Sequence, residues 1–360
     1  MKKTFIVILM VCLISILDSP LQAMFPKPEY APALVIREIG RTELSEGHIQ
    51  ELQVKILRGK LKGKEYPAQN RVWAEQGYNV MADTGRKVIV QIKNGESGLL
   101  IYVSGKYRAP YTFAAVILFI LVFAYVSGKE FFRGILSVSI NVLLILFALL
   151  PMIRAGYPPV ATTLFLCAIG IAISVRLILG GGEKFISASL GAFAGVVAAA
   201  IMTSFFSEYM DIAGLFSEGS RLLYTASHRL AGWGVTDLPG LDSAGIMVAA
   251  LGSVVDVSVS IASACFSVAE EVDSRMSIWQ SGLAVGRDII ATMLNSLVLV
   301  FFSAALPLML VFQAADIPFI VAGNYDMLVI LITGAVIASS GLVISVPATA
   351  AVSAWRGYRR

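Results

Sequence analysis

The chain has 360 residues, of which 57% are hydrophobic and only 14% are charged, and its formal net charge is +4. A soluble globular protein carries about 25% charged residues, so this composition predicts a membrane protein. The basic residues are scattered rather than clustered, which argues against a nucleic-acid partner. The three cysteines all lie in apolar segments and the two histidines lie far apart, so we expect no disulfide framework, no metal site and no cofactor.

Residues 1–23 have the pattern of a secretory signal peptide. Lys2 and Lys3 form a positive start, an apolar stretch follows, and Ala23 ends a suitable cleavage sequence. An uncleaved signal anchor is the alternative, because Leu21 is unusual at its position in a cleavage site. Both alternatives place residue 24 outside the cytoplasm.

Residues 24–110 have a different composition, and we expect them to form an extracytoplasmic β-rich domain. Apolar and polar residues alternate over residues 35–39 and 87–93, and Asn94-Gly95 predicts a hairpin turn before a strand at residues 99–103. Short strands separated by turns indicate a small β-barrel or sandwich. The domain holds 14 Lys or Arg residues against 9 Asp or Glu residues. Such a surface would attract anionic lipid or an anionic wall polymer, and the alternative is an ordinary solvated basic face.

From residue 111 the chain predicts a helical transmembrane domain over residues 111–353, followed by a basic cytoplasmic tail at 354–360. Each span is long enough, or nearly so, to cross about 30 Å of hydrocarbon. The loops predicted to face the cytoplasm, with the tail, hold nine basic residues, and the outer loops after residue 111 hold three. This bias predicts a multi-pass protein of the cell (plasma) membrane with its C-terminus in the cytoplasm. The seven expected spans are 111–127, 135–153, 159–178, 186–206, 243–265, 288–312 and 327–352.

Two polar stripes interrupt the apolar pattern of the fifth and sixth spans. Asp256, Ser260 and Ser263 recur at helical spacing on the fifth span, and Asp288, Thr292 and Asn295 do so on the sixth. A carboxylate inside a membrane-spanning helix costs on the order of 3 kcal/mol, so it needs a partner or a function. We expect the two stripes to face one another and to form an intramembrane ion or solute site, with Arg287 as a cytoplasmic gate or anchor.

Simpler roles stay open for most of these residues. Ser260 and Ser263 are also small enough to serve helix packing alone. Asp288 is also a candidate N-terminal cap of the sixth helix, and Arg287 a positive-inside anchor. Asp256 lies about nine residues from the nearest end of its expected span, too far for a cap. The pair Gly191 and Gly195 predicts a close helix contact.

The chain resembles the YibE/F family of bacterial integral membrane proteins over essentially its whole mature length. Two stretches carry the resemblance, residues 250–264 around Asp256 and residues 286–299, and Leu306-Pro307 supports it. Two features differ from the family pattern. Ala291 stands where a glycine is typical, and Phe301-Phe302 replaces a more usual Ala-Tyr pair.

The resemblance implies a multi-pass architecture and leaves the activity open between two classes. The first is a transporter or permease that carries a small solute or ion through the lipid bilayer, with Asp256 as the proton or cation site. The second is a non-transporting envelope component that uses its basic β-domain to bind a partner. Catalytic motifs are absent from the sequence, so we expect no enzyme and no catalytic residues. A homo-oligomer is compatible with both classes.

Overall fold

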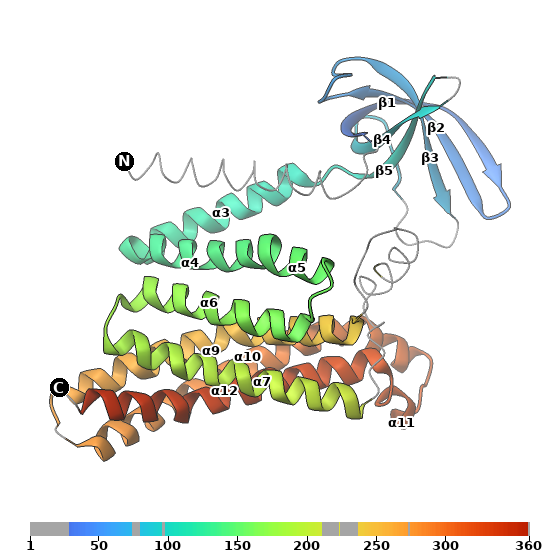
Figure 1. The fold of residues 1–360 in the computed structure, drawn as a ribbon. Helices are drawn as coiled ribbons and strands as arrows, with labels where there is room; N and C mark the ends of the chain where they lie inside the picture. The colour runs from blue at the N-terminus through green and yellow to red at the C-terminus, as the bar shows by residue number, and fades with distance from the viewer. Residues whose placement is uncertain are drawn as a thin grey trace. The chain divides into compact units, whose positions relative to one another are not determined.

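The computed structural model describes residues 29–73, 80–95, 98–210, 223, 237–272 and 274–358 (Figure 1). The chain divides into two compact units, Met1–Val126 and Ser127–Arg360, each of which has its own architecture. The expected signal segment, residues 1–23, lies outside the described residues.

The first unit contains a closed barrel of five strands. Around the barrel the order is β1-β2-β3-β5-β4; β3 and β5 pair in parallel, and the other neighbours pair antiparallel. This arrangement is the five-stranded Greek-key barrel called the OB-fold. Of the two β architectures expected from the sequence, the structure therefore has the barrel. The strands are β1 (Glu29–Leu44), β2 (Gly47–Ile56), β3 (Glu65–Trp73), β4 (Lys87–Gly95) and β5 (Gly98–Lys106).

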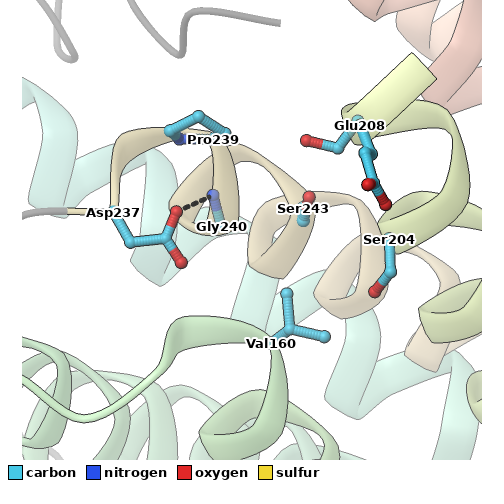
Figure 2. A pocket seen from close by; sticks show the side chains of 8 residues that line it. Val160, Ser204, Glu208, Asp237, Pro239, Gly240 and Ser243 are labelled. Carbon is cyan, nitrogen blue, oxygen red and sulfur yellow. Dashed lines mark hydrogen bonds between the residues drawn. The ribbon is translucent and has the colours of Figure 1, made fainter. Parts of the chain in front are cut away.

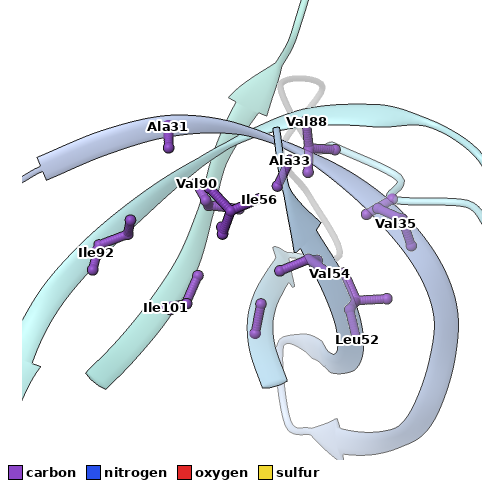
Figure 3. Close-up of a cluster of buried hydrophobic side chains, with 12 residues drawn as sticks. Ala31, Ala33, Val35, Leu52, Val54, Ile56, Val88, Val90, Ile92 and Ile101 are labelled. Carbon is purple, nitrogen blue, oxygen red and sulfur yellow. The ribbon is translucent and has the colours of Figure 1, made fainter. Parts of the chain in front are cut away.

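Small and β-branched side chains fill the interior of the barrel (Figure 3). They alternate along the strands with outward-facing residues, as Val88 and Val90 do on β4. One buried position on β3 is polar: Asn70 Nδ2 donates to Gln50 Oε1 at 2.7 Å and to the Val80 carbonyl oxygen at 2.6 Å. The pair therefore satisfies its hydrogen-bonding groups inside the barrel. The expected hairpin is present, because Gly95 at the end of β4 pairs with Gly98 at the start of β5.

Among the described residues, seven helices are long and apolar enough to cross a membrane, the same number as the apolar segments expected from the sequence. One of them, residues 131–154, contains a π-helical turn just before Pro151, whose ring and missing N–H do not fit a regular α-helix. The elements are α3 (Ala109–Ser127), η1 (Gly128–Glu130), α4 (Phe131–Leu144), η2 (Ile145–Leu149), α5 (Leu150–Arg154), α6 (Pro159–Leu179), α7 (Glu183–Tyr209), α9 (Leu238–Ala269), α10 (Arg275–Ala314), α11 (Phe319–Ala322) and α12 (Asp326–Gly357).

Helices α7, α9, α10 and α12 run side by side and form the centre of the second unit (Figure 1). Their backbones approach closely where glycines meet. A Cβ at Gly195 would overlap the carbonyl oxygen of Gly341, and a Cβ at Gly191 would overlap Thr349. The close contact expected at Gly191 and Gly195 is therefore confirmed, and it joins α7 to α12. Packing of this kind replaces the hydrophobic effect as the attraction between helices in a bilayer.

Helix α10 begins earlier than the sequence pattern predicts. It starts at Arg275 rather than at residue 288, and the side chain of Ser274 caps it by accepting from the Ser277 N–H at 3.4 Å. Polar residues in its first turns lower the hydropathy without breaking the helix, so the apolar pattern alone places its start too late. Asp288 lies well inside α10, and the alternative of an N-terminal cap is therefore wrong.

Candidate functional site

Helices α9 and α10 are antiparallel and touch through small residues of α10. Gly286 lies against Ile261. One turn earlier on α10 and one turn later on α9, Gly282 lies against the Cys265 sulfur. A Cβ at Gly282 would overlap the Cys265 sulfur, and a Cβ at Gly286 would crowd Ile261, so the glycines permit the close approach. Because the helices are antiparallel, residues that precede Ile261 on α9 lie at the same height as residues that follow Gly286 on α10. Asp256 is therefore level with Thr292.

Both expected stripes are exposed on the surface of the helical unit. Asp256 and Ser260 are exposed on α9, with Ser263 half-buried at the edge of the stripe. Between positions 245 and 267, no exposed residue of α9 is larger than aspartate. The exposed positions in this segment are Gly245, Ala249, Gly252, Asp256, Ser260 and Ser267. On α10, the three expected residues Asp288, Thr292 and Asn295 are all exposed.

The two stripes lie beside one another rather than face to face, contrary to the sequence-based expectation. The α9–α10 contact is made by apolar residues such as Val257 and Ile261, which also pack against Val346 of α12. Counted around each helix at 100° per residue, both stripes point away from α12 and toward the same side. We call this exposed side the polar flank; its members are Asp256, Ser260, Ser263, Ser267, Asp288, Thr292 and Asn295.

The hydroxyl groups of the polar flank donate their protons to their own helices. Ser260 Oγ donates to the Asp256 carbonyl oxygen at 2.9 Å, and Thr292 Oγ1 donates to that of Ile289 at 2.9 Å. Ser263 does the same to Val259 at 2.8 Å. Their oxygen lone pairs therefore stay available as acceptors on the polar flank. Oxygen acceptors of this kind suit water, a proton carrier or a hard cation.

The charged side chains near the polar flank are not paired with one another. In the described part of the chain, the four ion pairs involve none of Asp256, Asp288 and Arg287. Arg287 is exposed, and its position around α10 places it toward α12 rather than among the flank residues. The structure therefore brings six of the seven expected site residues together and separates Arg287 from them.

A second polar site was not predicted from the sequence. A hollow of about 310 Å³ lies between the start of α6, the end of α7 and the start of α9 (Figure 2). Asp237 caps α9 there by accepting from the Gly240 N–H at 2.7 Å, and Ser243, 4% exposed, lines the hollow. The full lining is Val160, Ser204, Ser207, Glu208, Asp237, Pro239, Gly240 and Ser243. The sequence offers one sign of this site, namely Asp237 as a cap residue before Leu238-Pro239 at the start of α9. Spacing alone does not connect it to Glu208, which belongs to α7.

Other polar residues inside the helical unit join helices rather than line a site. Thr349 Oγ1 donates to Ser258 Oγ at 3.1 Å between α12 and α9, and both residues are fully buried. Asn141 Nδ2 donates to Ser174 Oγ at 2.7 Å between α4 and α6. Hydrogen bonds between membrane helices of this kind stabilise packing.

Comparison with known proteins identifies one family. The family described as YibE/F-like protein matches residues 115–358, which includes all seven polar-flank residues. None of the curated proteins and none of the solved structures that were compared matches the chain.

Proposed function

The chain belongs to the YibE/F-like protein family, and we propose that it is a multi-pass membrane protein that carries a proton or a small cation along the polar flank. One observation carries this proposal: the Asp256 carboxylate is exposed in the middle of a long apolar helix, level with Thr292. An intramembrane carboxylate that faced lipid alone would be strongly unfavourable. Asp256 therefore requires water, a cation or a donor beside it.

The polar-flank residues suggest distinct roles in such a path. Asp256 would accept the proton or bind the cation, because it supplies the negative charge at the centre of the flank. The hydroxyl oxygens of Ser260 and Thr292 would replace part of the hydration shell of the ion. Asp288 offers a second carboxylate one turn away, and the Asn295 amide offers both a donor and an acceptor. A small polar solute with matching hydrogen-bonding groups would use the same residues.

The charge distribution supports an orientation for this path. We propose that residues 24–110 lie outside the plasma membrane and that the C-terminus lies in the cytoplasm, because the basic residues gather in the loops of that side. The hollow around Glu208 and Asp237 then lies at the outer end of α9. Asp256 lies roughly 20 Å further along α9 from Ser243. Arg287 lies on the cytoplasmic side of Asp256.

A polar flank inside a bilayer also needs a cover, and we propose a second copy of the chain. Helix α3 cannot supply matching groups, since residues 113–124 are all apolar. In a dimer with twofold symmetry, the polar flank of one copy would face the polar flank of the other. The Asn295 amide N–H groups would then donate to carboxylates of the other copy. The small exposed residues of α9, such as Ala249 and Gly252, allow two helices to approach closely.

Cation flux into liposomes tests the transport proposal. The full chain is reconstituted, a potential is imposed, and internal pH and sodium are followed with dyes. We expect flux in the wild type and at least a tenfold loss in Asp256→Asn, which keeps the shape but loses the charge. Asp326→Asn, the same change in the first turn of α12, is the matched control and should stay within twofold. Equal flux in the wild type and in Asp256→Asn would refute the proposed role of this carboxylate.

A further inference from the structure

One outer face of the barrel carries a row of aromatic and amide side chains that crosses four strands. Tyr102 of β5 lies beside Gln69 of β3 on one side and Gln91 of β4 on the other. Gln91 in turn pairs with Tyr30 of β1, and its Nε2 donates to the Tyr30 hydroxyl oxygen at 2.9 Å. All four residues alternate with buried positions, so they share the outward face. We call this set the aromatic row.

Basic side chains flank the aromatic row and lie over aromatic rings. The Lys93 ammonium lies 5.7 Å from the centre of the Tyr102 ring, and the Arg71 guanidinium lies 4.1 Å from that of Trp73. Cations at these distances are attracted to the ring faces. Arg71 follows Gln69 as the next outward residue of β3, and Lys93 follows Gln91 on β4.

Negative charge is sparse on this part of the barrel. Strands β4 and β5 contain three lysines and no Asp or Glu residue. The single carboxylate of β3, Glu65, accepts from Gln53 Nε2 of β2 at 2.9 Å. The carboxylate of Glu29 lies beside Gly59. Glu51 of β2, which pairs with Gln69, is an exposed carboxylate at the β3 end of the row. Among the described residues, the charged side chains of β5 and β4 are therefore all positive.

We propose that the aromatic row, with Arg71 and Lys93, binds an anionic carbohydrate polymer. Tyr30 and Tyr102 offer ring surfaces for the apolar faces of sugar rings. The amides of Gln69 and Gln91 offer donors and acceptors for hydroxyl groups. Arg71 and Lys93 complement phosphate or carboxylate groups along the chain. OB-fold proteins commonly bind oligosaccharides on the face of strands 2 and 3. Here the row includes β3 but extends away from β2, over β5 and β4.

A lipid surface fits this face less well than a polymer does. Attraction to anionic headgroups needs only scattered cations, whereas this face places two amides in line with two tyrosines. The row also lies in the middle of β3, β5 and β4 and reaches the start of β1, so an extended polymer can cross several strands in succession. This binding is independent of the proposed transport, so each proposal can fail without the other.

Binding of a defined polymer to the full chain tests the inference. The protein is held in nanodiscs of neutral lipid, and polygalacturonate is titrated against it, with neutral dextran and polyglutamate as separate probes. We expect polygalacturonate to bind at least fivefold more tightly than either. Tyr102→Gln and Lys93→Gln should each weaken this binding roughly three- to tenfold. Lys55→Gln, which removes an exposed lysine of β2, should stay within twofold.

The outcomes decide between charge, lipid and sugar recognition. Equal binding of polyglutamate and polygalacturonate would overturn the inference, because charge alone would then explain it. Binding to vesicles rich in phosphatidylglycerol, without binding to polygalacturonate, would assign the face to lipid instead. A Tyr102→Gln variant that binds polygalacturonate as tightly as the wild type would also overturn the inference. Unchanged melting temperatures of both variants establish that any loss comes from the face rather than from unfolding.

Discussion

Ile261 of α9 packs against Gly286 of α10, and this contact fixes the depth at which the two halves of the polar flank meet. A Cβ at Gly286 would overlap Val346 as well. We expect Gly286→Val to destabilise the helical unit by about 1 to 3 kcal/mol, because the core has no space for extra methyl groups. Thermal unfolding in detergent measures the change. Gly252→Ala is the control: no neighbour lies within 4 Å of the added Cβ, so it should be nearly neutral. Equal melting temperatures for both variants would contradict the packing described.

The hydrogen bond between Asn141 and Ser174 should contribute measurably to the attachment of α4 to α6. A double-mutant cycle with Asn141→Ala and Ser174→Ala should give a coupling energy of about 0.6 kcal/mol and at most about 1.7 kcal/mol, as for other bonds between membrane helices. Unfolding in mixed detergents is the measurement. Strictly additive effects of the two substitutions would show that the bond contributes nothing.

The proposed second copy predicts a crosslink along α9. With the native cysteines replaced by alanine, Ala249→Cys should form a disulfide-linked dimer on mild oxidation in membranes. Ile201→Cys on α7 is the control, because it is 65% exposed on another helix and lies outside the polar flank. Dimer bands of equal intensity for both variants would indicate random collision, and the absence of a band for Ala249→Cys would exclude this interface.

The proposed orientation predicts opposite labelling of two exposed positions. Ser104→Cys on β5 should react with an impermeant thiol reagent added to intact cells. Tyr358→Cys, directly after α12, should react only after the membrane is opened. The reverse pattern would invert the topology, and protection of both positions in intact cells would contradict an extracytoplasmic barrel.

Hydrophobic pattern was sufficient to predict the number of membrane helices but not their ends. Helices α10 and α12 extend past the apolar stretches, since packing extends along them: Ile278 and Ala354 are buried in the same cluster although polar residues surround them. Strand β3 escaped prediction for a related reason. Its inward residues are Ala68, Asn70 and Val72, of which only the last has a strong strand preference.

The residues of the polar flank were predictable, whereas their arrangement was not. Helical spacing placed Asp256 with Ser260, and Thr292 with Asn295, because a period of 3.6 residues is a local property. Whether two stripes face each other depends on which residues touch between helices. Gly282 and Gly286 decide this, and spacing alone gave no reason to choose them over the polar residues nearby. The hollow around Asp237 and Glu208 was missed because its members come from three helices.

An ion path along the polar flank requires that water reach it. Ser260→Cys is introduced into the full chain with Cys12, Cys167 and Cys265 replaced by alanine, and membranes are treated with a charged, water-soluble thiol reagent. Phe165→Cys, 60% exposed on the apolar surface of α6, serves as the lipid-facing control. We expect rapid labelling of Ser260→Cys and at least tenfold slower labelling of Phe165→Cys. Labelling of Ser260→Cys as slow as that of Phe165→Cys would show that the flank is dry and would contradict an ion path along it.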